Sequence, residues 1–308
     1  MMKRATVALV GFDSNFAKDL IAVQGCLFPG VHLHIASPRS SKADITVVKF
    51  NSQDEIPGLI SHFPPSPGHL ILVGCDQNLN NLSQLQLLKA RHLIGGNGQS
   101  VAHEVAATIN KLATGNIWGF EPYFYGFQYY EIKYVRSASD IPNLFTSFSL
   151  NANFESLFEM ATDYTRVIIN ELVSNAVYNA PVDDQGKGKY ESTDRKIKVE
   201  LKESEKVSVS LCSNDELFGI SVQDNFGRLA IDRLIYHIAK SQDSREIVEH
   251  RAGGAGAGLF MIFHSANALI VNSQPGKRTE VICLIEKTKR YRLFRARVTS
   301  LHFFEVGG

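Results

Sequence analysis

Three short motifs follow one another in the second half of the chain, and they constrain it more than any other feature. They are Asn170–Ala176, Val222–Gly227 and Gly254–Leu259. The first places a carboxylate and an amide one helical turn apart. The second ends a strand-like run with an aspartate, and the third spaces glycines ahead of an apolar helix. An oxygen ligand for Mg²⁺, a hydrogen-bond acceptor for a base and backbone N–H groups for phosphates are the parts that a magnesium–nucleotide site needs.

The bulk composition sets the outer limits. At 308 residues the chain is long enough for two domains with separate cores. Its formal net charge of +1 predicts neither a nucleic-acid surface nor an anionic-membrane surface. No apolar run reaches the roughly 20 residues of a membrane span, and Asp13 interrupts the N-terminal apolar stretch too early for a signal peptide. Four cysteines without paired spacing predict free thiols in a reducing cytoplasm.

Residues 1–115 alternate strand-like and helix-like segments, which predicts an α/β domain with an open sheet. Continuous apolar runs indicate strands buried on both faces. The expected strands are Thr6–Gly11, Val31–Ala36, Ile45–Phe50, His69–Cys75 and His92–Gly95; the expected helices end near Leu27 and cover Ser100–Leu112.

This first architecture resembles the receiver domain of two-component signalling in its topology. A working receiver has an acidic pair after its first strand, a phosphorylatable aspartate after the third and a lysine after the fifth. Here Asp13 stands alone, Asn51 follows the third strand, and the fifth runs into Gly95 and Gly96. We therefore expect a pseudo-receiver, a docking or dimerisation module without phosphoacceptor chemistry. Another small α/β domain is the alternative.

A second domain is expected over residues 129–308, after a packed, aromatic connector at 116–128. Its pattern predicts an α+β two-layer sandwich, with helices on one face of a mixed sheet and a C-terminal strand extension. The expected strands are Gln128–Val135, Val207–Cys212, Phe218–Gln223, Leu269–Ser273 and Thr279–Glu286; the expected helices cover Ile141–Ser147 and Phe154–Ala180 and begin at Ala230 and Leu259.

The order and spacing of the three motifs resemble the histidine-kinase-like ATPase superfamily, which histidine kinases, DNA gyrase, heat-shock chaperone ATPases and mismatch-repair ATPases share. Within it the anti-sigma-factor serine kinases are the most similar. The resemblance covers residues from about 130 to 286. It implies ATP and Mg²⁺ as cofactors, and it implies that the segment between Arg228 and Gly253 is a lid that closes on the γ-phosphate.

The resemblance also implies roles for single residues. Glu171 matches the general base, Asn175 the Mg²⁺ ligand and Asp224 the acceptor for the adenine amino group. The remaining expected nucleotide contacts are Asn179, Gly227, Gly254, Gly256, Gly258, Leu259 and Thr279. The family has glycines two and four residues after the aspartate, whereas this chain has Phe226 and Arg228 there, so its backbone must take a different path.

Other chemistries fit less well. A dinucleotide-binding fold would need a third glycine where Leu259 stands, and a P-loop would need Lys-Ser/Thr after the glycines. His103 lies on a helix and echoes a histidine-kinase phosphoacceptor, but the second long helix of a dimerisation hairpin is missing. The basic segment Lys287–Arg297 could bind nucleic acid or an acidic partner, although a solvated edge strand running to Phe304 is the better interpretation.

The sequence thus predicts a cytoplasmic, ATP- and Mg²⁺-binding signalling protein. It would act as a serine/threonine-type kinase or ATPase, or as an ATP-switched regulator of an unidentified partner protein, and it could form a homodimer. We expect neither a membrane nor a nucleic-acid partner. Two alternatives stay open: a non-catalytic scaffold that kept the fold but lost nucleotide binding, and a histidine phosphotransferase.

Overall fold

The computed structural model describes residues 5–27, 30–36, 43–52, 54–55, 58, 70–74, 90–96, 99–124, 126–148, 160–195, 197–243, 257–296 and 299–307. The chain folds into two compact units. The first combines Met1–Tyr123 with Ala296–Phe304, and the second combines Phe124–Arg295 with Glu305–Gly308. Near its C-terminus the chain therefore returns from the second unit to complete the first.

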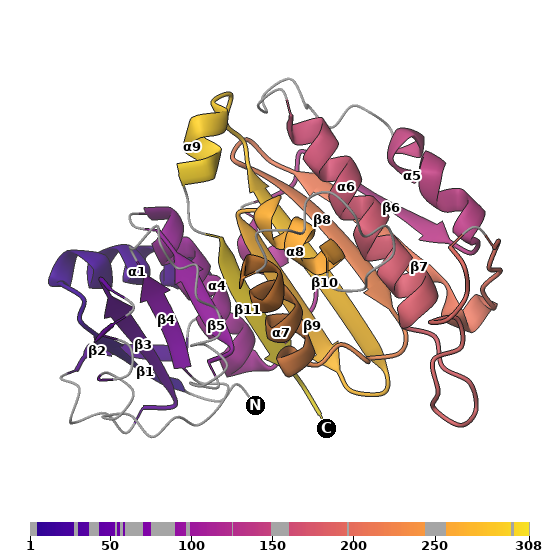
Figure 1. Ribbon diagram of the computed structural model, residues 1–308. Helices are drawn as coiled ribbons and strands as arrows, with labels where there is room; N and C mark the ends of the chain where they lie inside the picture. The colour runs from indigo at the N-terminus through magenta and orange to yellow at the C-terminus, as the bar shows by residue number, and fades with distance from the viewer. Residues whose placement is uncertain are drawn as a thin grey trace. The chain divides into compact units, whose positions relative to one another are not determined.

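The first unit is built on a sheet in the order β2-β1-β3-β4-β5-β11 (Figure 1). Its strands are β1 (Ala5–Val10), β2 (Val31–Ile35), β3 (Ile45–Phe50), β4 (Leu70–Gly74), β5 (His92–Gly95) and β11 (Ser300–Glu305). The first five strands pair in parallel, and β11 runs antiparallel to β5. The order 2-1-3-4-5 is that of a doubly wound sheet.

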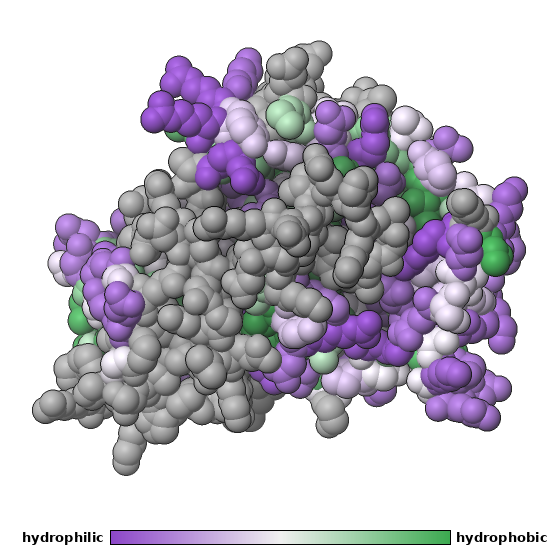
Figure 2. Space-filling model, in the orientation of Figure 1, coloured by the Kyte–Doolittle hydropathy of each residue, from purple (hydrophilic) through white to green (hydrophobic). Residues whose placement is uncertain are grey.

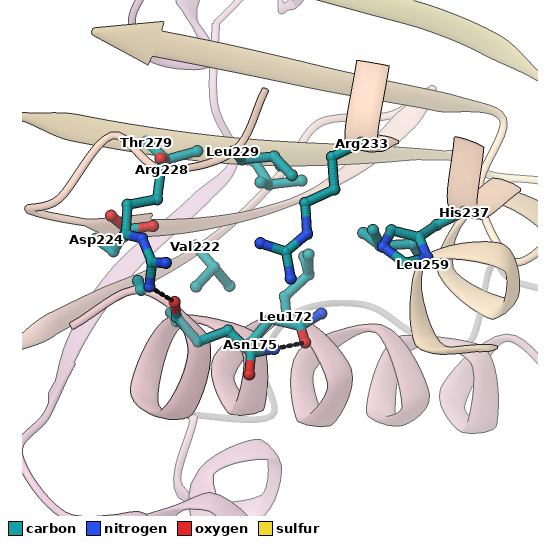
Figure 3. A pocket seen from close by; sticks show the side chains of 14 residues that line it. Leu172, Asn175, Val222, Asp224, Arg228, Leu229, Arg233, His237, Leu259 and Thr279 are labelled. Carbon is teal, nitrogen blue, oxygen red and sulfur yellow. Dashed lines mark hydrogen bonds between the residues drawn. The ribbon is translucent and has the colours of Figure 1, made fainter. Parts of the chain in front are cut away.

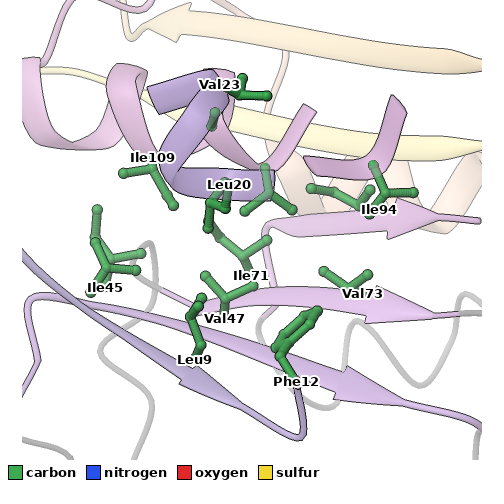
Figure 4. Packing of buried hydrophobic residues seen from close by; sticks show 14 residues of the cluster. Leu9, Phe12, Leu20, Val23, Ile45, Val47, Ile71, Val73, Ile94 and Ile109 are labelled. Carbon is green, nitrogen blue, oxygen red and sulfur yellow. The ribbon is translucent and has the colours of Figure 1, made fainter. Parts of the chain in front are cut away.

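Two helices of this unit, α1 (Ser14–Leu27) and α4 (Gln99–Thr114), pack against each other. The helical stripe Val101, Val105 and Ile109 on α4 meets side chains from the four central parallel strands (Figure 4). The strand side of this buried cluster consists of Val7, Leu9, Ile45, Val47, Ile71, Val73 and Ile94. Alternate strand residues thus supply one face of the sheet to the core.

Two expectations about this unit are wrong. Strand β2 is largely exposed rather than buried on both faces, because it lies at the border of the sheet and, among the described strands, pairs with β1 alone. The C-terminal segment is not a solvated edge strand of the second domain. Residues Tyr291–Ala296 form helix α9, and β11 is a buried strand with Leu301 opposite Leu93 of the first unit. Its inward face carries Leu301 and Phe303, whose pairing partner is too distant in sequence for local patterns to indicate.

The second unit contains an antiparallel sheet in the order β9-β10-β8-β7-β6 (Figure 1). Its strands are β6 (Tyr129–Val135), β7 (Val207–Ser213), β8 (Leu217–Asp224), β9 (Ala268–Gln274) and β10 (Arg278–Glu286). All four pairings between these strands are antiparallel. The Gln274–Lys277 turn joins β9 to β10 as the sequence predicts.

The helices of this unit are α5 (Ile141–Ser147), α6 (Ala161–Ser174), α7 (Ile231–Asp243), α8 (Ala257–His264) and α9 (Tyr291–Ala296). Helix α6 packs on β8 and α8 packs on β9, while α5 and α7 contact α6 and α8 respectively. The apolar side of α6 is buried against the strands, with Ile168 and Leu172 among its members. The expectation of one α-helix through Ala180 is wrong in its last turn, because Asn175–Asn179 is π-helical.

Hydrophilic side chains gather over α9, at the upper left of Figure 2. They include the exposed Lys289, Arg290, Arg292 and Arg295. Arg295 also donates to the carbonyl of His264 at 3.0 Å, at the C-terminal end of α8. Through the described part of the chain, no helix has both the length and the apolar character that crossing a bilayer requires.

Candidate functional site

An open pocket of about 700 Å³ lies between the helices and the sheet of the second unit (Figure 3). Its walls come from α6 with its π-helical end, β8, the loop after β8, α7, α8 and β10.

Residues from all three sequence motifs line this one pocket. They are Asn175 from the first motif, Asp224 from the second and Leu259 from the third, together with Asn179 one turn after Asn175 and Thr279 on β10. They meet because α6 crosses β8 and α8 enters beside them. The predicted glycines Gly254 and Gly256 lie outside the described residues.

Glu171 lies one turn before Asn175 and does not line the pocket itself. Its carboxylate lies against Gly258 in the first turn of α8, where an added Cβ would collide with Oε2. The colliding atoms belong to the end of a flexible side chain, so an alanine at position 258 would displace the Glu171 carboxylate from this contact. Burial raises the pKa of the half-buried Glu171 carboxyl, and the positive charge of Arg195 opposes that rise.

Asp224 ends β8 and is 9% exposed. Its Oδ1 accepts from the backbone N–H groups of Phe226 at 2.8 Å and Gly227 at 3.3 Å, which closes a tight turn. Burial raises the pKa of Asp224 to about 6, against the lowering effect of these two N–H groups. Thr279 lies directly opposite Asp224 on β10 and is also buried.

Gly227 explains the displaced glycine of the second motif. Its φ of +63° is in the left-handed region, and an added Cβ would collide with the carbonyl oxygen of Gln274. The turn after Asp224 thus packs against the β9–β10 turn, where the N–H of Gly276 bonds to the Gly227 carbonyl at 3.3 Å. A glycine at 227, rather than at 226 or 228, is what this path requires.

Asn175, the expected metal ligand, is oriented by its neighbours. Its Oδ1 accepts from Nδ2 of Asn179 at 2.9 Å (Figure 3). The Oδ1 of Asn179 in turn accepts from Arg195 at 3.4 Å, and Arg195 also donates to the Ser174 carbonyl at 3.2 Å. Since arginine only donates, these contacts fix which way both amides point. One lone pair of the Asn175 oxygen remains for a metal.

Arg195 is held by the chain around it. Its guanidinium carbon lies 4.2 Å from the centre of the Tyr178 ring, a cation–π arrangement. The Tyr178 hydroxyl donates to the carbonyls of Arg195 and Ile197, at 3.2 Å each. These contacts fold the segment between residues 181 and 201 back onto the end of α6. Sequence reasoning missed Arg195, because nothing local indicates a contact with the first motif.

Three cationic or titratable side chains of the pocket were also missed: Arg228, Arg233 and His237. Arg228 donates to the Asn179 carbonyl at 2.7 Å and pairs with Glu191 at 3.1 Å. Figure 3 shows Arg228 beside Asp224 at one end of the pocket, His237 at the other, and Arg233 reaching toward Asn175. The four-residue spacing of Arg233 and His237 on a helix could have indicated a shared face.

These residues fit a magnesium nucleotide. The pocket offers a buried carboxylate, an oriented amide oxygen and cationic side chains suited to phosphates. Gly258 stands at the start of α8, where a helix N-terminus favours anions. Among the described residues there is no cluster of three or more His, Cys, Asp or Glu that could hold a metal.

The expected lid is described as far as residue 243. Its first part forms α7, where Leu234, Ile235 and Ile238 are buried. Residues 244–256, which include the rest of the lid and most of the glycine loop, lie outside the described part of the chain.

The first unit places its candidate residues differently. The Asp13 carboxylate caps α1 by accepting from the N–H groups of Asn15 at 3.0 Å and Phe16 at 2.8 Å. The exposed Asn51 follows β3. His103 lies on α4 with its Nε2 buried.

A scan of the chain against models of protein families finds no match, and a search of curated proteins finds no match either.

Proposed function

We propose that the second unit binds ATP with Mg²⁺ and that the chain is a signalling protein of the cytoplasm, kinase-like or switched by ATP, which acts on a partner protein. The observation that carries this proposal is the meeting of Asn175, Asp224 and Leu259, from three separate motifs, in one pocket. The proposed histidine-kinase-like ATPase architecture, most similar to the anti-sigma serine kinases, rests on the same residues. A pseudo-receiver role for the first unit is part of this proposal.

The two ends of the pocket differ in charge, as the base end and the phosphate end of a nucleotide site do. Asp224 lies at one end, and Arg233 with His237 lies toward the other (Figure 3). A carboxylate accepts from an exocyclic amine and repels a carbonyl oxygen, so Asp224 favours adenine over guanine. Guanidinium groups bind phosphate oxygens well, so Arg233 suits the phosphate end.

The chain's own residues then have separate tasks. Asn175 offers an oxygen to the metal, with Asn179 and Arg195 holding that oxygen in place. Glu171 is positioned behind it as the group that accepts a proton from water or from a serine or threonine hydroxyl. The raised pKa of Glu171 makes it a better base than an exposed carboxylate. Bound Mg-ATP supplies a transferable phosphoryl group and the charge that stabilises its transfer.

One observation favours the scaffold alternative. Arg228 occupies the base end of the pocket, where the related proteins have glycine, and it is tied to Asn179 and Glu191. If these ties hold the side chain in the space that a base needs, the fold would persist without nucleotide. We do not propose the histidine phosphotransferase, because a phosphoacceptor needs exposed ring nitrogens and Nε2 of His103 is buried.

Calorimetric titration of the full chain distinguishes nucleotide binding from the scaffold alternative. We expect ATP and ADP to bind in the presence of Mg²⁺, and ATP to bind more weakly when EDTA removes the metal. GTP should bind at least about tenfold more weakly than ATP, because it loses one charged hydrogen bond to Asp224. Absence of binding by all three nucleotides would support the scaffold instead.

A further inference from the structure

The border strand β6 carries an unusual exposed face. Tyr130, Ile132 and Tyr134 are 49%, 41% and 52% exposed, although they are large and mainly apolar. They alternate along the strand, so they share one face of the sheet. In the order of strands β6 is the last one of the second unit, and among the residues that the structure describes β7 is the one strand that pairs with it.

The other face of β6 carries charge. Glu131 and Lys133 pair with each other at 3.1 Å, and Lys133 also lies 5.4 Å from the centre of the Phe148 ring, just after α5. These residues thus belong to the helix-covered face, and the three exposed side chains belong to the opposite face. The seven residues of β6 include neither proline nor glycine, so each of them can take part in a further strand pairing. Inward-facing charges such as Glu131 and Lys133 protect an edge strand from indiscriminate pairing, so a strand that pairs with β6 must place opposite charges against them.

The sequence of β6 is complementary to itself. When two copies run antiparallel with Ile132 opposite Ile132, Glu131 of each copy lies opposite Lys133 of the other. In the same register Tyr130 lies opposite Tyr134. A shift by two residues in either direction would instead place Glu131 opposite Glu131, or Lys133 opposite Lys133, which is unfavourable.

We propose that β6 is a dimerisation strand, which pairs antiparallel with β6 of a second copy of this chain about a two-fold axis at Ile132. The pairing extends the sheet of the second unit across both copies and gathers six exposed side chains, Tyr130, Ile132 and Tyr134 from each, on one face. Directly opposed opposite charges and aromatic pairs each stabilise an antiparallel pair. A two-fold axis uses the same surface on both copies, as most homodimers do.

Charge reversal tests this register directly, by sedimentation velocity over a range of protein concentrations. The parent should show a reversible monomer–dimer equilibrium. Glu131→Lys and Lys133→Glu should each weaken the dimer by about tenfold or more, because each places like charges opposite at two symmetric positions. The double variant E131K/K133E should restore the dimer, since its charges again alternate in sign across the axis.

A mixing experiment removes the effects of each substitution on its own chain. Glu131→Lys and Lys133→Glu should each be monomeric at a concentration where their equimolar mixture forms a heterodimer, because only the mixture brings opposite charges together. Lys198→Glu, a charge reversal at an exposed residue of the same unit, should leave the parent equilibrium unchanged. Thermal melting of each variant shows that it is folded.

Several outcomes would overturn the proposal. A parent that stays monomeric at every concentration leaves β6 without this role. A dimer that neither single reversal weakens must use another surface. Failure of the mixed variants to associate, with both of them folded, would exclude the Glu131–Lys133 register. The proposal does not depend on nucleotide binding, and ATP is absent throughout.

Discussion

Nδ2 of Asn179 donates to Oδ1 of Asn175 across one turn of the π-helical end of α6, at 2.9 Å. The expected metal-binding oxygen is therefore oriented by a second residue, and that residue is oriented by Arg195. Single-turn π-helices are frequent at functional sites, and this one places the two amides on one face. Arg195 also acts on Glu171 through its charge. One exposed arginine thus influences both the metal ligand and the expected base.

Replacing Arg195 with glutamine should lower the affinity of the ATP-bound chain for Mg²⁺ by about 10- to 100-fold. This is the loss that follows when a residue that orients a metal ligand is removed. The substitution should also raise the pKa of Glu171 further, because the charge that opposes its burial is gone. Calorimetry with Mg²⁺ varied measures the first effect, and carboxyl chemical shifts against pH measure the second. Lys198→Gln removes a cation from the same segment and should change neither quantity. Equal Mg²⁺ dependence in Arg195→Gln and the parent would show that the amide orientation is not set by Arg195.

Glu171→Gln should keep the affinity for ATP within a few-fold and lower phosphate release or transfer by about 10²–10⁴-fold. The amide has nearly the same size, so the close contact with Gly258 is preserved while the proton acceptor is lost. Glu216→Gln, at an exposed turn, is the matched control and should behave as the parent does. If Glu171→Gln abolishes binding, or retains full turnover, Glu171 is not the base.

Asp224 should make both stability and nucleotide affinity depend on pH. Its pKa of about 6 in the folded chain lies above the ordinary value near 4, so the folded state holds this proton more tightly. The stability that the neutral carboxyl contributes is complete below pH 4 and is lost as the pH rises through 6. Asp224→Asn cannot ionise, so its stability relative to the parent should rise between pH 4 and 7, by up to about 3 kcal/mol.

The affinity for adenine nucleosides should instead rise as the pH rises through 6, since an ionised carboxylate is the better acceptor for the adenine amino group. Adenosine, which has no phosphate to titrate, should bind the parent about fourfold more weakly at pH 5.5 than at pH 7.5. Asp224→Asn should bind weakly at both pH values. Chemical denaturation and fluorescence titration give the two profiles, and a parent with flat profiles would contradict the burial of this carboxyl.

Two positive-φ glycines in neighbouring turns, Gly227 after β8 and Gly276 between β9 and β10, offer a matched pair. Gly276 has a φ of +70° and open space where a Cβ would lie, so Gly276→Ala should cost only the backbone strain, about 1–2 kcal/mol. Gly227 has a similar φ of +63°, but its Cβ would meet the backbone of Gln274 and Arg278. Gly227→Ala should therefore destabilise the chain by clearly more than Gly276→Ala in urea unfolding. Equal losses would show that the turn after Asp224 can move away from the hairpin.

Local patterns predicted most of the elements, because periodicity and turn residues act over a few positions. Strands β3 and β5 and helix α5 have the expected bounds. What could not be predicted depends on contacts between distant residues. The pairing of β11 with β5 joins residues about 200 positions apart, and the contact of Arg195 with Asn179 needs the fold of the segment between them. The exposure of β2 likewise follows from its place in the sheet, which its own sequence does not indicate.

The residues of the candidate site likewise fall into those that local patterns predicted and those that depend on tertiary contacts. Motif spacing identified Asn175, Asp224 and Leu259, and the family resemblance added Thr279; these four residues line one pocket. Arg228 was noticed only as a departure from a glycine pattern, and its ties to Asn179 and Glu191 depend on the tertiary structure.

The most direct test of the account is the ATP dissociation constant in Mg²⁺ of the parent and of three variants, one from each motif: Asn175→Ala, Asp224→Asn and Gly258→Ala. Each should fold as the parent does and bind ATP at least about tenfold more weakly, since each removes or displaces a separate part of one site. Lys198→Gln should bind as the parent does. A parent that does not bind Mg-ATP, or three variants that bind it as tightly as the parent, would contradict the claim that these motifs form a nucleotide site.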